Sequence, residues 1–217
     1  MARATVVEPK DLDHAARVAR VTGSQGIRNA AILLSIFGTG LTPSELAALR
    51  VADAVRENGE LASKTILPAH VAYNGYERTI FWANPKLRSG MDDYLNWRVD
   101  NGVGVGSPGR FRGLDPYSAL FINGRTGNGF AATGYEKGGV QRESAMVLSA
   151  LIRQLLKQAG VDGNARSGRR SLAVWLGRQG KDPALVREML GLRSITATKT
   201  LMQHDPVRMG DIVARAF

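Results

Sequence analysis

The chain has 217 residues, 44% of them hydrophobic, and a net charge of +10 with a pI near 10.4. This length and apolar content suffice for one substantial domain, which we expect to span residues 1–217. The longest apolar run, "AAILLSIF", is too short to cross a membrane, and the N-terminus has no secretory pattern, so we expect a cytoplasmic protein. The absence of cysteine excludes disulfides and thiolate chemistry, and three scattered histidines make a metal or other cofactor unexpected.

The helical and extended segments of the first half follow from apolar spacing and from local capping patterns. Apolar periodicity predicts helices over residues 11–20, 26–37 and 85–99. Thr42 begins a Thr-x-x-Glu capping box with a proline after it, which predicts a helix from about Pro43 to Leu49. Asn74-Gly75 lies between two apolar, β-branched segments and predicts a short antiparallel hairpin with a tight turn.

The second half contains glycine-rich loops and then a series of helices. The loops cover residues 101–113 and 123–139, with at most a strand at 119–123, and neither has the Gly-Lys-Ser/Thr ending of a phosphate loop. Residues 140–160 predict a strong amphipathic helix that stops at Gly160. Further helices are expected over 169–179, 183–190 and 195–203, with a short one over 206–217. The predicted fold class is mainly α with a small antiparallel β-hairpin, an α+β arrangement.

The positive charge is concentrated in the last third of the chain. Residues 1–136 contain 15 basic and 13 acidic residues, whereas residues 137–217 contain 14 basic and 6 acidic residues. An asymmetry of this size usually serves a polyanionic partner. Double-stranded DNA is therefore the expected partner, and a basic surface kept for solubility is the alternative.

Four segments, in this order, carry a resemblance to a known family. They are "GTGLTPSELAALRVAD", "NGYERTI", "RSGRRSLAVWL" and "VREMLGLRSITATKTLMQH". Together they resemble the catalytic domain of the tyrosine recombinases, the phage integrase family. The resemblance spans nearly the whole chain, and it implies that fold without the separate N-terminal core-binding domain usual in the family.

The resemblance implies a chemistry that this sequence does not reproduce. The family exchanges DNA strands through a covalent phosphotyrosine, using two arginines on the phosphate, a lysine, histidines and the nucleophilic tyrosine. The residues at these positions are Thr42 for the first arginine, Tyr73 or Tyr76 for the lysine, Arg166 for a histidine, the retained Arg169, Leu192 for the last histidine and Leu201 for the nucleophile. Because leucine cannot attack phosphorus, we predict no catalytic residues and a protein that is not an enzyme.

The basic residues near these positions are the candidates for DNA contact. Arginine in place of histidine at 166 adds charge while removing an acid–base group, which favours binding. The predicted DNA-binding residues are Arg166, Arg169, Arg170, Arg193, Lys199 and Arg208. The apolar residues of the same region, Leu192, Ile195, Leu201 and Met202, are expected in the core.

Three functions are compatible with these patterns. The favoured one is a catalytically inactive, recombinase-like DNA-binding protein, an accessory or regulatory factor in recombination, integration or transcription that acts as a homo-oligomer or with a recombinase. The second is a protein-interaction module that pairs with an active recombinase or another partner. The third is an active recombinase with displaced residues, such as Tyr73 or Tyr135. An open basic groove at Arg166, Arg169 and Arg170 would favour the first, and their burial in ion pairs would weaken it.

Overall fold

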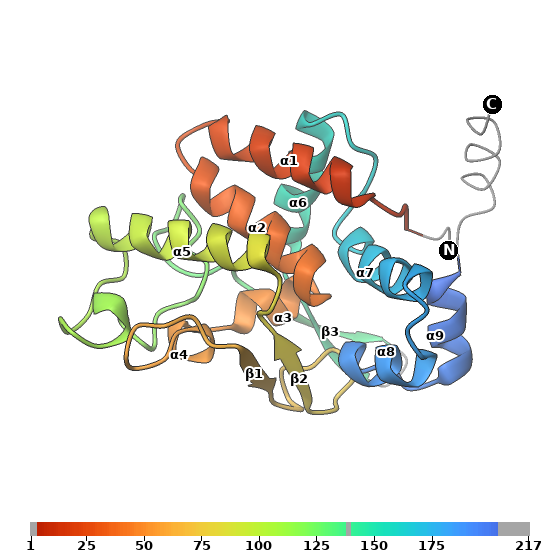
Figure 1. The fold of residues 1–217 in the computed structure, drawn as a ribbon. Helices are drawn as coiled ribbons and strands as arrows, with labels where there is room; N and C mark the ends of the chain where they lie inside the picture. Colours follow the sequence, from red (N-terminus) through yellow and green to blue (C-terminus); the bar gives the residue numbers. More distant parts are fainter. Residues whose placement is uncertain (1–3, 138–139, 204–217) are drawn as a thin grey trace.

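The computed structural model describes residues 4–137 and 140–203, with side chains omitted for residues 137 and 140–142. A body of helices carries two small hairpins below it, and the last three helices pack against one side (Figure 1). The helices are α1 (Pro9–Val21), α2 (Gly26–Thr39), α3 (Pro43–Ala48), α4 (Val51–Ala54), α5 (Pro85–Asp100), α6 (Met146–Gln158), α7 (Ser167–Arg178), α8 (Pro183–Leu190) and α9 (Ile195–Met202), with a 3-10 turn, η1, at Phe111–Gly113. Among the described helices, none has the length and apolar character that a membrane span requires.

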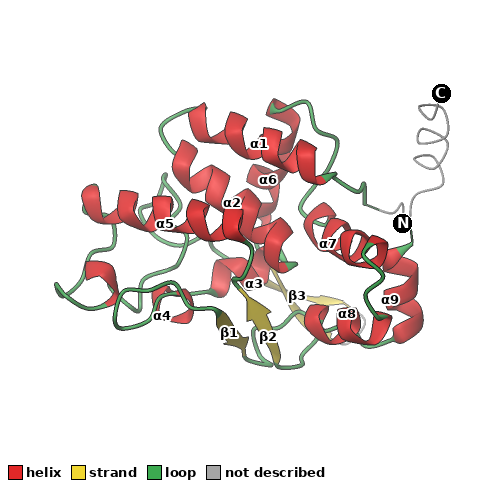
Figure 2. Cartoon of the chain, in the orientation of Figure 1, coloured by secondary structure: helices red, strands yellow, loops and turns green. Residues whose placement is uncertain are grey.

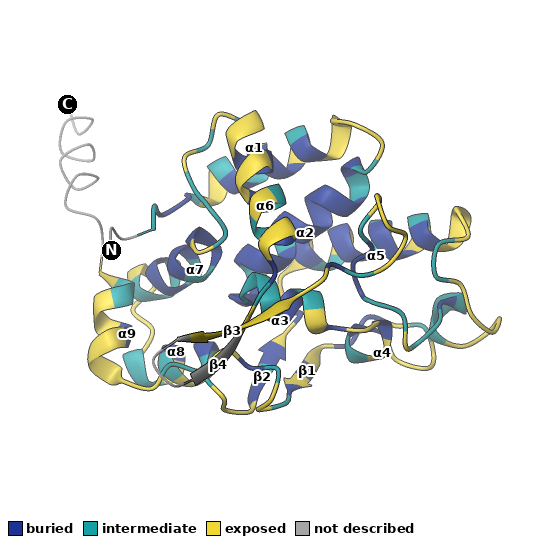
Figure 3. Ribbon diagram, turned by 180° about the vertical axis from the view of Figure 1, so that it is seen from behind, coloured by how far each residue is buried: buried dark blue, intermediate teal, exposed yellow. Residues whose placement is uncertain are grey.

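Helix α2 is the centre of the core, and α1, α5, α6 and α7 pack around it. Its side chains Ile32, Leu33, Ile36 and Phe37 are fully enclosed. Buried residues follow this helix and the inner faces of its neighbours, while most of α9 and residues 133–136 are exposed (Figure 3). The helix is capped by Gly40, whose φ of +68° lies in the left-handed region that glycine adopts without strain. The chain then turns directly into the candidate site.

Helix α3 starts as its capping box predicts. The Thr42 hydroxyl accepts a hydrogen bond from the Glu45 amide at 3.3 Å, and the Glu45 carboxylate accepts one from the Thr42 amide at 2.7 Å. An N-cap of this kind contributes about 1 kcal/mol to stability. The cap also fixes the direction of the Glu45 side chain, which matters for the site described below.

The first hairpin is confirmed, but its predicted tight turn is wrong. Strands β1 (Lys64–Leu67) and β2 (Arg78–Phe81) pair antiparallel, and the last pair is Leu67 with Arg78 (Figure 2). Residues 68–77 therefore form a ten-residue loop, within which Gly75 has a φ of +72°. Pro68 has no amide hydrogen to continue the ladder, so the strands separate there.

A second hairpin replaces the start of a predicted helix. Strands β3 (Thr133–Lys137) and β4 (Val140–Ser144) pair antiparallel, so helix α6 begins only at Met146. The helical prediction over 140–160 was wrong for its first residues because the preceding segment supplies a pairing partner. The dipeptide Gly138-Gly139 between the strands is a hairpin signal that could have indicated this. The strand expected at 119–123 is absent from the described residues, which form only isolated bridges there.

The last three helices begin and end within two residues of their predicted limits. They share a second apolar cluster, formed by Ala173, Val186 and Leu190, against which Leu192, Leu201 and Met202 are partly buried. Ile195 is 41% exposed, so its predicted place in the core is wrong. The helix expected over 206–217 and the predicted DNA contact Arg208 lie outside the described residues.

Candidate nucleic-acid interface

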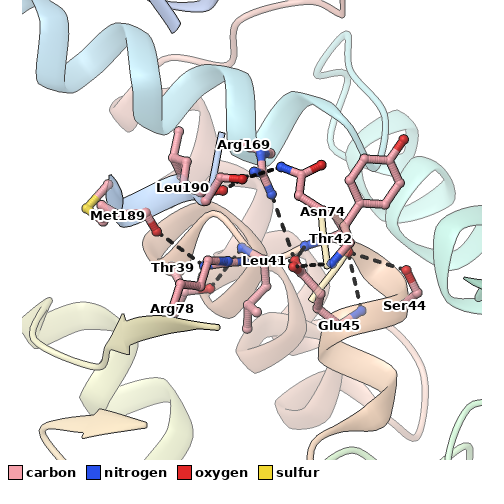
Figure 4. Close-up of polar contacts among 12 residues, drawn as sticks. Thr39, Leu41, Thr42, Ser44, Glu45, Asn74, Arg78, Arg169, Met189 and Leu190 are labelled. Atoms are coloured by element: carbon pink, nitrogen blue, oxygen red, sulfur yellow. Dashed lines mark hydrogen bonds and ion pairs between the residues drawn. The ribbon is translucent and has the colours of Figure 1, made fainter. Parts of the chain in front are cut away.

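The side chain of Glu45 is the centre of a buried polar cluster at the start of α3 (Figure 4). One carboxylate oxygen accepts hydrogen bonds from the Thr42 amide at 2.7 Å and from Arg78 Nη2 at 2.9 Å. The other accepts from the Tyr73 amide at 3.0 Å. Arg169 Nη1 lies 3.9 Å from the first oxygen. One carboxylate thus holds two arginines, one from β2 and one from α7.

The cluster carries a net positive charge in a buried place. Side-chain exposure is 1% for Glu45, 3% for Arg78 and 13% for Arg169. Burial acts to raise the pKa of Glu45, but Arg78, Arg169 and the amides of Thr42 and Tyr73 together lower it below its ordinary value. Burial lowers the pKa of Arg169 to about 10, although Glu45 acts to raise it. Glu45 and Arg169 are therefore both ionised at neutral pH.

Arg169 has one donor group that the rest of the described chain does not satisfy. Its Nη2 donates to the Leu190 carbonyl, whereas its buried Nη1 makes no hydrogen bond within the described residues. A buried, unsatisfied N–H on a charged group is costly, because its lost contact with water is not replaced. An anionic oxygen would satisfy such a group well.

The same cluster holds the C-terminal end of α8. Three successive carbonyls there accept hydrogen bonds from outside the helix: Met189 from Arg78 Nη1 at 3.3 Å, Leu190 from Arg169, and Gly191 from the Asn74 side chain. The last carbonyls of a helix have no partner within it and favour cationic donors. Arg78, Arg169 and Asn74 thereby join the last helices to the loop between β1 and β2.

The 73–76 segment of that loop lies next to the link between α8 and α9. Arg193 Nη2 donates to the Asn74 carbonyl at 2.9 Å, and the Arg193 guanidinium lies 5.5 Å from the centre of the Tyr76 ring. The side chains of Tyr73 and Tyr76 are 45% and 59% exposed. A hollow of about 250 Å³ adjoins the loop, and Ser44, His70, Tyr73, Gly134 and Glu143 are among the residues that line it.

Comparisons of the sequence and the fold with known proteins point to one class of enzyme. No family model matches the chain. The tyrosine recombinase XerA of Pyrococcus furiosus is 25% identical over 210 residues, which are 96% of this chain and 62% of that protein. The chain therefore spans less than two thirds of the length of this curated relative. The chain is homologous to a tyrosine recombinase.

Solved structures show the same fold. A crystal structure of XerA recombinase matches 97% of the chain with a TM-score of 0.64 and 17% identity, over 62% of that protein chain. The XerH site-specific recombinase bound to a palindromic difH substrate matches 99% of the chain with a TM-score of 0.64 and 17% sequence identity. The match covers 53% of the XerH chain. A lambda integrase dimer bound to a COC' core site matches 94% of the chain with a TM-score of 0.58 and 11% sequence identity. The match covers 60% of the integrase chain. The predicted fold class is confirmed.

The relationship corrects one prediction. We predicted that the chain is not an enzyme, and this is contradicted because its homologue is a recombinase, which is an enzyme. The prediction assumed that Leu201 in the nucleophile position settles the question. It does not, because homology to an enzyme over 96% of the chain outweighs this single position.

The residues of this recombinase homologue that were predicted to bind DNA have different surroundings. Arg166, at the start of α7, is exposed, as are Arg193 and Lys199. Arg169 belongs to the buried cluster and is largely covered. Arg170 is only 3% exposed, which does not suit the predicted DNA contact. The open basic groove at positions 166, 169 and 170 that would have favoured DNA binding is therefore not formed, because successive residues of a helix point in different directions. The burial of Arg169 in an ion pair with Glu45 weakens the DNA-binding hypothesis at this position.

Thr42, Leu192 and Leu201 have structural roles in the recombinase homologue. Thr42 caps α3, and the two leucines are partly buried against the second apolar cluster.

Sequence reasoning missed three contributors to the cluster: Glu45 as an ion-pair partner, Arg78 and Asn74. A signal existed for one of them, because Arg78 falls on the inward side of an alternating strand, between an exposed turn and buried Ile80. A charged residue at such a position is usually paired.

Proposed function

We propose that this recombinase homologue binds double-stranded DNA through its phosphates and works as a factor in DNA recombination. The observation that carries the proposal is the buried cationic cluster, in which Arg169 Nη1 has no hydrogen-bond partner among the described residues. A phosphate oxygen matches this donor in charge, and the contact requires the covering groups to move aside, because Nη1 is buried. Arg166, Arg193 and Lys199 would add exposed positive charge near it.

Two further facts support DNA as the polyanion. The last third of the chain carries most of the net charge, and this third includes α7 to α9. Solved structures with this fold include the Tn1549 transposon integrase in complex with a circular intermediate DNA, the XerH recombinase bound to its difH substrate and the lambda integrase bound to a core site. The proposed complex would assemble as a homo-oligomer or with another recombinase.

Arg166→Ala tests the proposed phosphate contacts. We expect the variant to bind duplex DNA more weakly whatever its sequence. The slope of log affinity against log salt concentration should become less steep by about 1, as expected for the loss of one phosphate contact. Fluorescence anisotropy over a range of salt concentrations measures both quantities. Arg153→Ala, which removes an exposed arginine from α6, is the control and should bind as the wild type does. No binding by the wild type even at low salt would contradict the proposal.

A second candidate function, DNA strand cleavage by Tyr73, rests on a specific arrangement. The Tyr73 amide donates to Glu45 at 3.0 Å, which holds Tyr73 beside the arginine cluster, and Tyr73 lines a hollow together with His70 and Ser44. In this reaction the phenol oxygen would form a bond to a backbone phosphorus and pass its proton to a base, for which His70 is the candidate. The bridging oxygen of the phosphodiester would leave and take up a proton, becoming a hydroxyl.

Nicked suicide substrates test this second function, because they trap a covalent protein–DNA adduct once the short leaving strand diffuses away. We expect the wild type to form an adduct that survives denaturing electrophoresis, and Tyr73→Phe to form none. Tyr135→Phe is the control, since Tyr135 is also exposed but lies on β3. An adduct that persists in Tyr73→Phe would exclude Tyr73 as the nucleophile.

A further inference from the structure

Tyr76 and Arg193 form an exposed aromatic–cation pair that neither the fold nor the cluster requires. The Tyr76 ring is 59% exposed, although a large aromatic side chain gains most by burial. The Arg193 guanidinium lies over the ring, 5.5 Å from its centre. The pair brings together a loop residue and a residue that follows α8, so only the tertiary structure creates it.

The loop that carries Tyr76 is held in place from several directions. The Tyr73 amide donates to Glu45 at 3.0 Å, and the Gly75 amide donates to the Ala72 carbonyl at 2.8 Å. The Asn74 side chain donates to the Gly191 carbonyl, and its own carbonyl accepts from Arg193 at 2.9 Å. Tyr76 is therefore presented by an ordered backbone, which lowers the entropy that a ligand must overcome on binding.

The chemistry of the pair suits a flat, electron-rich ring next to a phosphate. Nucleobases stack on exposed tyrosine rings with little dependence on sequence, and arginine adds a cationic contribution. A base within an intact duplex already has both faces covered by its neighbours. Only a base that has left the stack can use the Tyr76 ring, and its own phosphates would then lie near Arg193.

We propose that Tyr76, backed by Arg193, is a stacking site for an unpaired DNA base. The proposal rests on the proposed DNA binding and adds a preference to it: DNA with an unpaired base binds better than a fully paired duplex. Arg193 orients the ring from one side, and the base covers its exposed surface.

The test uses the full chain and two short duplexes that differ only in one extra, unpaired 2-aminopurine. We expect the wild type to bind the duplex with the unpaired base about 5-fold more tightly or better, and the 2-aminopurine fluorescence to fall on binding. Tyr76→Ala should lose this preference and keep its affinity for the paired duplex. Tyr76→Trp, which retains an aromatic face, should keep the preference, while Tyr76→Leu, which retains only apolar bulk, should lose it.

Tyr117→Ala is the matched control. Tyr117 is 75% exposed and lies on a loop whose Pro116 carbonyl accepts a hydrogen bond from α4, so its removal should leave both affinities as in the wild type. Equal binding of the two duplexes by the wild type, or an unchanged preference in Tyr76→Ala, overturns the stacking site alone. Absence of binding to both duplexes overturns the proposed function and this inference with it.

Discussion

Replacing Arg98 by methionine lowers the free energy of unfolding by about 3–5 kcal/mol, because several buried carbonyls lose the donor that they share. Arg98 has no exposed surface, and burial lowers the pKa of its guanidinium. It donates to the carbonyls of Val103, Gly104, Ala119 and Leu120 and to the Ser118 hydroxyl. Methionine fills similar space but removes this donor from the carbonyls of Val103, Ala119 and Leu120, at about 1–3 kcal/mol for each one that water does not reach. The Gly104 carbonyl still accepts from the Asp115 amide at 2.9 Å.

This side chain organises a segment that has little regular structure. Residues 101–120 contain only the short 3-10 turn, and Arg98 reaches them from the last turn of α5. Urea unfolding followed by tryptophan fluorescence measures the expected loss. Arg20→Met is the control, because Arg20 pairs with Asp93 at the surface and should contribute less than about 1 kcal/mol. Equal stabilities of the two variants would show that the segment does not depend on Arg98.

Glu45→Gln has the second large expected effect, again a loss of about 3–5 kcal/mol. The change removes the only carboxylate that pairs with Arg78 and Arg169 among the described residues, and it leaves two buried cations side by side. Because these arginines also bind the end of α8, we expect faster amide hydrogen exchange in α8 and α9. Glu57→Gln is the control, since Glu57 and its partner Arg110 are both largely exposed. A variant as stable as the control would contradict the central role of Glu45.

The stability that Glu45 contributes depends on pH in a defined direction. Its pKa in the folded protein lies below the ordinary value of 4.5. A carboxylate whose pKa is lowered by folding contributes fully above its unfolded pKa, and the contribution is lost as the pH falls through the folded pKa. The difference in unfolding free energy between the wild type and Glu45→Gln should therefore be largest near neutral pH and shrink below about pH 4.5. A difference that stays constant down to acidic pH would contradict this assignment.

Much of the local structure was predictable because it depends on neighbouring residues. Apolar spacing located most helices, and the Thr-x-x-Glu pattern correctly placed the start of α3. The errors arose where a partner distant along the backbone competes with local preference. Residues 140–144 have helical character in sequence but pair with β3, and Pro68 turns an expected tight hairpin into a long loop.

The candidate site was only partly predictable. Arg169 was identified through the resemblance, and Arg193 through its charge, but Arg170 was placed at the DNA although it is buried. The function of Glu45 in the site was missed, because the capping box already explained its presence. The same carboxylate does both tasks: it accepts a hydrogen bond from the Thr42 amide and forms ion pairs with two arginines.

The sequence by itself determined a helical, strongly basic protein with the order of elements found in a recombinase fold, because periodicity, caps and charge are properties of neighbouring residues. Only the tertiary structure decided which charges meet. Arg78 and Arg169 lie far from Glu45 along the chain, and Tyr76 lies far from Arg193, yet each pair is in contact. Such contacts depend on how α7 and α8 pack against the loop after β1, and no local pattern encodes that packing.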